Sequence, residues 1–140
     1  MKLAMIVVIA LAGCSTLGPE KNYSSEEMMS AAVALSKVSA AAEANLRYGS
    51  PSASQSDSAF LEQSVAHDPE LLKPLAPYLI KSMRQNGHAV ILLCSRDGTT
   101  ALLEDAGCTA ALDRHRWRDN PSSRCAFSVD AAKLCPAAGN

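Results

Sequence analysis

The chain has 140 residues, with 13 basic and 14 acidic side chains and a formal net charge of −1. This length suits one modest domain, and the near-neutral balance gives no electrostatic reason to expect a nucleic-acid partner. Aromatic residues make up only 4% of the chain, so its core must be built mainly from Leu, Val, Ile and Ala.

The first fourteen residues have the three-part order of an export signal. Met1-Lys2 supplies a positive start, an uncharged apolar run covers residues 3–12, and small residues lead to Cys14. A charged start, an apolar stretch of about 7–15 residues and a small-residue cleavage site are typical of a secretory signal peptide. A membrane-spanning helix needs about 20 apolar residues, so we expect residues 1–13 to be removed rather than retained as a span.

The end of this signal, Leu11-Ala12-Gly13-Cys14, resembles the lipobox of bacterial lipoproteins. The resemblance implies cleavage between Gly13 and Cys14, a diacylglycerol on the Cys14 thiol, and an acyl chain such as palmitate on the new amine. It makes the membrane a partner through the lipid on Cys14, because several acyl chains anchor a protein stably. Ser15 stands where enteric lipoproteins of the inner membrane carry Asp, so the resemblance favours the outer membrane, facing the periplasm. The alternative is ordinary cleavage after Ala12, which would release a soluble protein.

A polar tether over residues 14–23 and an Ala-rich helix over 24–49 follow. Ser24 and Glu27 have the spacing of a capping box, which starts a helix. Met28, Leu35 and Ala42 recur every seven residues, so a coiled coil is one interpretation. Because there are fewer than three clean heptads and the seam residues are mostly small, we favour an amphipathic helix that packs on its own domain.

Residues 50–58 have Ser at every second position together with Pro51. This composition predicts a flexible linker, with a reach of roughly 15–18 Å. We therefore predict a boundary between the helix and a C-terminal domain over residues 59–140.

The first part of that domain has the sequence signals of helices. We predict a short helix over Phe60–Ala66 and a new helix start at Asp68-Pro69-Glu70. Pro74 and Pro77 interrupt this second helix, so the pattern predicts a broken entry and then a helix over Pro77–Asn86 that ends at Gly87. Its buried side would comprise Leu75, Tyr78, Leu79, Ile80 and Met83.

The strongest β signal lies between residues 88 and 104. His88–Cys94 is an apolar run of strand length, Asp97-Gly98 is a dipeptide that hairpin turns favour, and Thr100–Glu104 returns. Both faces of this hairpin carry Leu, so we expect a helix on one face and the C-terminal tail on part of the other. A two-residue loop predicts three cross-strand pairs: Cys94 with Ala101, Leu93 with Leu102, and Leu92 with Leu103.

Four cysteines besides Cys14 lie in the last third of the chain, and an even number in a small exported domain predicts two disulfides. A straight strand would place Cys94 and Cys108 about 23 Å apart, beyond the roughly 7 Å that a bridge spans between Cα atoms. We therefore prefer Cys94 with Cys135 and Cys108 with Cys125, while pairs 94–108 and 125–135 remain an alternative. No C-x2-C or H-x3-H spacing is present, so no metal site and no cofactor is predicted.

The tail predicts a short helix near Ala110–Trp117 and a strand over Cys125–Val129. Three arginines surround the only tryptophan there, and Arg and Trp are enriched at binding hot spots. Arg114, Arg116, Trp117 and Arg118 therefore form a candidate partner surface, although a solvated helix face explains the same pattern.

No sequence motif points to catalysis. His67, His88 and His115 are scattered, and Glu104-Asp105 would point to opposite faces of a strand, which argues against a paired acid and base. Together the patterns predict an α+β protein with an N-terminal helix, a Ser-rich linker and a small helix and hairpin domain held by two disulfides. We expect a non-enzymatic interaction or structural module of the envelope; the alternative is a small envelope hydrolase. Neither the partner nor the oligomeric state follows from the sequence.

Overall fold

The computed structural model describes residues 23–109 and 124–135, and it has the predicted α+β class. Its three strands form one antiparallel sheet in the order β1-β2-β3. Among the described residues no helix is long and apolar enough to cross a membrane. The elements are α1 (Ser25–Tyr48), α2 (Asp57–Ser64), the 3-10 helix η1 (Pro69–Leu75), β1 (Leu79–Gln85), β2 (His88–Cys94), β3 (Ala101–Ala106) and α4 (Ala131–Leu134).

Helix α1 begins at the predicted capping box. The Ser24 hydroxyl accepts a hydrogen bond from the Glu27 amide, and the Glu27 carboxylate accepts one from the Ser24 amide. Met28, Leu35 and Ala42, which suggested a coiled-coil seam, are at most 1% exposed and pack within the protein's own core. The interpretation as an amphipathic helix on its own domain is therefore confirmed for this face.

The Ser-rich segment differs from the predicted linker. Helix α2 begins inside it, with the Ser56 side chain as its N-cap. Arg84 of β1 donates hydrogen bonds to the carbonyl oxygens of Ser52 and Gln55, at 2.9 and 2.7 Å. The two helices, η1 and the sheet also share one hydrophobic cluster, so the segment joins parts of one core and marks no boundary between them.

The predicted helix over Pro77–Asn86 is wrong, because strand β1 occupies most of this range. Asn86 and Gly87 have φ angles of 53° and 78°, and Gln85 pairs with His88 across them. Positive φ at both central residues defines the tight turn that Asn-Gly favours and that joins twisted antiparallel strands. Gly87 therefore belongs to a hairpin turn and does not end a helix.

The second hairpin confirms its predicted strands but only part of its register. Cys94 pairs with Ala101 as predicted, whereas Leu93 pairs with Leu103 and Leu92 with Glu104. The register shifts between Leu93 and Cys94, which leaves Leu102 as the extra residue of a bulge. From there on, each β3 residue lies one position away from its predicted partner.

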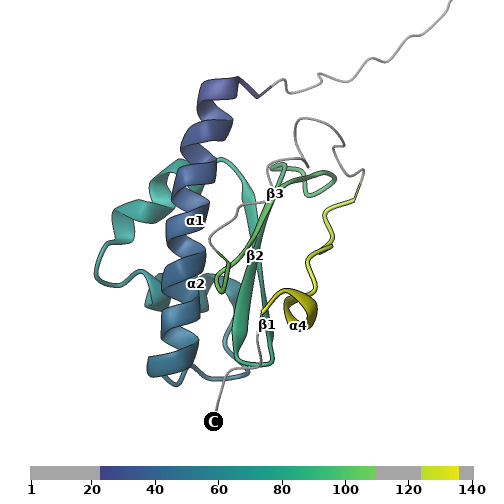
Figure 1. Ribbon diagram of the computed structural model, residues 1–140. Helices are drawn as coiled ribbons and strands as arrows, with labels where there is room; N and C mark the ends of the chain where they lie inside the picture. The colour runs from purple at the N-terminus through teal and green to yellow at the C-terminus, as the bar shows by residue number, and fades with distance from the viewer. Residues whose placement is uncertain (1–22, 110–123, 136–140) are drawn as a thin grey trace, which may run out of the picture.

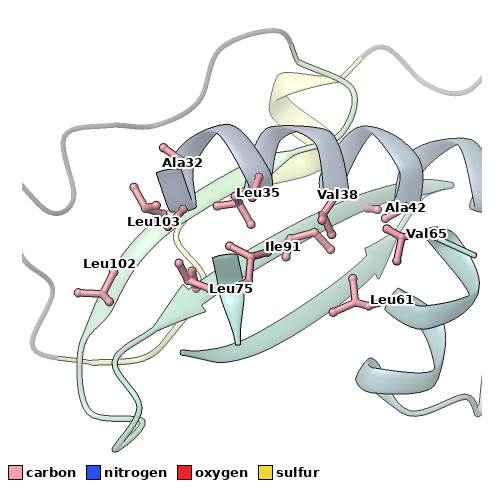
Figure 2. Packing of buried hydrophobic residues seen from close by; sticks show 14 of the residues in the cluster. Ala32, Leu35, Val38, Ala42, Leu61, Val65, Leu75, Ile91, Leu102 and Leu103 are labelled. Atoms are coloured by element: carbon pink, nitrogen blue, oxygen red, sulfur yellow. The ribbon is translucent and has the colours of Figure 1, made fainter. Parts of the chain in front are cut away.

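The sheet is the middle of three layers, with α1 and α2 on one face and the C-terminal tail with α4 on the other (Figure 1). On the helical face, the side chains of Leu35 and Val38 from α1 point toward Ile91 and Leu103 of the sheet (Figure 2). On the tail face, Val90 and Leu92 are covered by apolar residues of the tail, including Phe127. Because both faces are covered, every residue of β2 is buried.

Two disulfides attach the tail, but the preferred pairing is wrong. Cys94 pairs with Cys125 and Cys108 with Cys135, with Cα–Cα distances of 5.6 and 5.9 Å. Cys94 and Cys108 do each pair with the tail, as predicted. They lie at opposite ends of the β2–β3 hairpin, so their partners depend on the direction in which the tail crosses the sheet, which spacing alone does not reveal.

Candidate functional site

A row of polar side chains lies buried between the second half of α1 and the sheet. Four of its members are at most 5% exposed, and Arg47 reaches the surface. We call this set the polar row: Ser39, Glu43, Arg47, His88 and Asp105.

Glu43 is the centre of the polar row. Its Oε1 lies 2.6 Å from His88 Nδ1 and accepts from Arg47 at 2.9 and 3.1 Å, while Oε2 accepts from the Ala89 amide at 2.8 Å. Burial, the largest single influence, would raise the pKa of Glu43. The hydrogen bonds from Ala89, His88 and Arg47, with the charge of His88, outweigh it and hold that pKa below its ordinary value. Glu43 is therefore a carboxylate fully engaged by its own chain.

Asp105 of β3 contacts Ser39, which lies one turn before Glu43 on α1, and its environment differs from that of Glu43. Its carboxylate accepts a hydrogen bond from the Ser39 hydroxyl. Burial raises the pKa of Asp105 to about 6, and the bond to Ser39 offsets only part of this effect. Near neutral pH the protein thus holds a buried carboxylate whose ionised form is poorly compensated.

Gly107 explains how α1 comes so close to the end of β3. A Cβ atom at this position would lie 2.6 Å from Glu43 Cβ and closer still to the Ser39 carbonyl oxygen. Only glycine therefore allows the backbone to pass the polar row at this distance.

Glu104 lies on the opposite face of β3 from Asp105, as the strand alternation predicts. Its carboxylate accepts from the Ser128 amide and hydroxyl, both at 2.8 Å, and from the Val129 amide at 3.0 Å. The two adjacent acids therefore serve separate layers: Asp105 faces α1, and Glu104 holds the tail on the sheet.

His88 also lies beside a disulfide. One of its ring nitrogens and the Sγ atoms of Cys108 and Cys135 all lie within 4.8 Å of one another. This is the one grouping of three metal-ligating side chains found within the described residues. Sequence spacing does not reveal this grouping, because the three residues come from three segments at no ligand spacing and only the sheet and the tail bring them together.

An apolar pocket of about 300 Å³ lies between α2, η1 and β1. Leu75 and Leu61 form its buried walls, and Ser58 and Glu62 are the polar residues at its exposed side. Its lining comprises Ser58, Leu61, Glu62, Leu72, Leu75, Ala76, Tyr78 and Ile80. Such walls can hold an apolar group but offer little to react with it.

The predicted site residues divide into two sets. The four disulfide cysteines lie where the sheet meets the tail. The residues predicted for cleavage and lipidation, Gly13 and Cys14, lie outside the described residues, as do the four of the candidate partner surface, Arg114, Arg116, Trp117 and Arg118.

No family model, no curated protein and no solved structure matches this chain. No domain family is therefore recognised for this chain.

Proposed function

We propose that this chain is the precursor of a lipid-anchored envelope protein that acts as a non-enzymatic interaction or structural module. The observation that carries this proposal is the lipobox-like Leu11–Cys14 sequence after a short apolar run. In the proposed mature protein, Cys14 is the first residue, carries the lipid and holds the module at the outer membrane, facing the periplasm. The two disulfides support an oxidising compartment, because such bonds persist outside the cytosol.

The buried acids support a module without catalytic chemistry. Glu43 and Glu104 each accept at least three hydrogen bonds from their own chain. Asp105 is buried against Ser39. A general acid or base must reach the proton that it transfers in a bound substrate. Glu43 holds α1 against the sheet and Glu104 holds the tail on it, and Asp105 is enclosed between Ser39 and the core, so none of the three is placed to transfer such a proton.

The anchor is tested by the intact mass of the protein expressed in a bacterium, compared with its Cys14→Ala variant. We expect a wild-type chain that starts at Cys14 and carries acyl chains, found in the membrane fraction. The variant should lack the lipid mass. Ser15→Ala is the matched control, because it changes the neighbouring residue and keeps the thiol.

A lipid-free wild-type mass that starts at Gly13 would overturn the anchor in favour of ordinary cleavage. Alkylation before and after reduction separates this question from the disulfides. Four thiols besides Cys14 should react only after reduction.

The Arg and Trp cluster remains our proposed partner surface. Its test is a photo-reactive amino acid in place of Trp117 in living cells, with the same substitution at Val33, an exposed residue of α1, as the control. A discrete crosslinked protein at position 117 that is absent at position 33, and that is lost when Arg116→Glu is added, would support the surface. Equal crosslinking at both positions would contradict it.

A further inference from the structure

The pocket between α2, η1 and β1 combines an apolar interior with an acidic mouth. Leu, Ile, Tyr and Ala side chains form most of its lining, Glu62 supplies the one carboxylate, and none of the eight lining residues is basic. We propose that this pocket binds a cationic amphiphile with a single alkyl chain, which inserts the chain between the leucines and leaves its ammonium group at Glu62. This binding activity goes beyond the proposed module function and does not depend on the lipid anchor.

The walls of the pocket are fixed before a ligand arrives. The Ser82 hydroxyl of β1 donates a hydrogen bond to the Asp57 carboxylate at the start of α2, at 2.7 Å. Two residues further along β1, Arg84 donates to the Gln55 carbonyl oxygen, also at 2.7 Å. These bonds hold α2 against β1. Because the site is already formed, little of the binding free energy is lost in ordering it.

The size of the pocket limits the ligand to one chain. Its volume of about 300 Å³ lies at the lower end of the range of ligand pockets, so the two chains of a phospholipid would not fit. Leu61 and Leu75 are buried, and Leu72 and Ile80 are partly buried against the same hydrophobic cluster. An inserted alkyl chain therefore contacts apolar side chains that are continuous with the core.

The polar residues at the mouth favour a cation. Ser58 and Glu62 are four residues apart on α2, a spacing that places both on one face of the helix. An ammonium group has three N–H donors, so the Ser58 hydroxyl and the Glu62 carboxylate can both accept from it. Within the described part of the chain Glu62 takes part in no ion pair.

The basic side chains of the neighbouring elements are engaged elsewhere. Lys73 of η1 pairs with Glu70, and Arg84 of β1 donates to backbone carbonyl oxygens. Neither forms an ion pair with Glu62, so the carboxylate attracts an ammonium group and repels a carboxylate ligand.

The test compares three ligands that share one chain length: decylammonium, 1-decanol and decanoate. Each displaces the uncharged fluorophore N-phenyl-1-naphthylamine from the full chain with Cys14→Ala and intact disulfides, below the micelle concentration. We expect one site, with decylammonium bound about two- to fivefold more tightly than decanol and decanoate more weakly than decanol. Shortening the chain toward hexylammonium should weaken binding by roughly fourfold per methylene.

Two pairs of variants locate the site. Glu62→Gln should remove the preference for the ammonium group and leave decanol affinity unchanged, whereas Glu26→Gln, at an exposed acid of α1, should change neither. Ala76→Trp should fill the pocket from its exposed mouth and weaken all three ligands at least tenfold. Ala66→Trp is its control, because Ala66 is exposed and does not line the pocket.

Three results would overturn the proposal. The first is the absence of saturable displacement by decylammonium. The second is an affinity for decanol or decanoate that equals the affinity for decylammonium. The third is an equal loss of binding in Ala76→Trp and Ala66→Trp, which would place the ligand outside this pocket.

Discussion

Two carboxylates buried between α1 and the sheet, Glu43 and Asp105, change the stability of the fold with pH in opposite directions. Burial dominates at Asp105 and raises its pKa to about 6, whereas donors from three residues surround Glu43 and lower its pKa. The ionised form of Asp105 therefore destabilises the fold, and the ionised form of Glu43 stabilises it. A substitution at each position should reveal this difference.

Asp105→Asn should remove a cost that the wild type incurs near neutral pH. Between the ordinary pKa of about 3.8 and the folded value of about 6, the native state binds more protons than the unfolded state, so wild-type stability falls as pH rises. We expect the advantage of the variant over wild type in free energy of unfolding to grow by about 1–3 kcal/mol from pH 4 to pH 7. Urea unfolding at both pH values measures this difference. Asp68→Asn, at an exposed acid, should show no such change.

Glu43→Gln should have the opposite sign. Glutamine has one acceptor oxygen for three donor residues, so we expect a loss of about 3 kcal/mol in the free energy of unfolding at pH 7. Since the pKa of Glu43 is lowered, its contribution is complete above about pH 4.5 and is lost as the pH falls through the folded value. The deficit should therefore shrink in acid. A deficit that is equal at pH 7 and pH 3, or an equal loss in the exposed control Glu26→Gln, would contradict this assignment.

A comparison of the helices and strands with the sequence shows which local signals are enough to locate an element. The capping box located the start of α1, and the apolar run 88–94 located β2, because each signal is local and has few competing interpretations. The sequence does not predict strand β1, because its apolar residues are few and because Pro77 and Gly87 stand where a helix would begin and end. Asn86-Gly87 was the stronger signal, since this dipeptide favours a hairpin turn.

The polar row was not predictable from these local patterns. His88 and Asp105 look like ordinary strand positions, and Glu43 looks like an exposed position of an amphipathic helix. The contacts of Glu43 with His88 and of Ser39 with Asp105 depend on where α1 lies along the strands. They also depend on the bulge at Leu102, which decides the sheet face on which each later β3 residue lies. Both are tertiary features that sequence spacing does not encode.

Gly107→Ala tests how closely α1 and β3 must approach. The added methyl group would meet Glu43 Cβ at 2.6 Å and the Ser39 carbonyl, neither of which can rotate away. We expect the free energy of unfolding to fall by about 2–4 kcal/mol and the contact between α1 and the sheet to form more slowly during folding. Gly98→Ala is the comparison, because there only the end of the Leu79 side chain is near, at 3.3 Å, and the cost is about 1 kcal/mol from its φ of +72°. Equal losses would show that the helix can shift aside.

The tail is a third layer that the sheet needs. Val90 and Leu92 face away from the helices, and Phe127 packs in both clusters on that side. Three sets of contacts hold the tail: the disulfide at each end and the hydrogen bonds from Ser128 and Val129 to Glu104 between them. Losing this layer would expose an apolar sheet face.

Removing the disulfides one at a time should separate these attachments. The bridges close loops with sequence separations of 31 and 27 residues, so chain entropy predicts a similar cost of about 3–4 kcal/mol for each. We expect the Ser128 and Val129 amides to stay protected from hydrogen exchange when either cysteine pair is changed to alanine, because the other bridge and Glu104 still hold the tail. Adding Glu104→Gln to either background should expose both amides. If one cysteine pair alone already exposes them, the carboxylate contributes nothing to the attachment, and the disulfides carry the third layer by themselves.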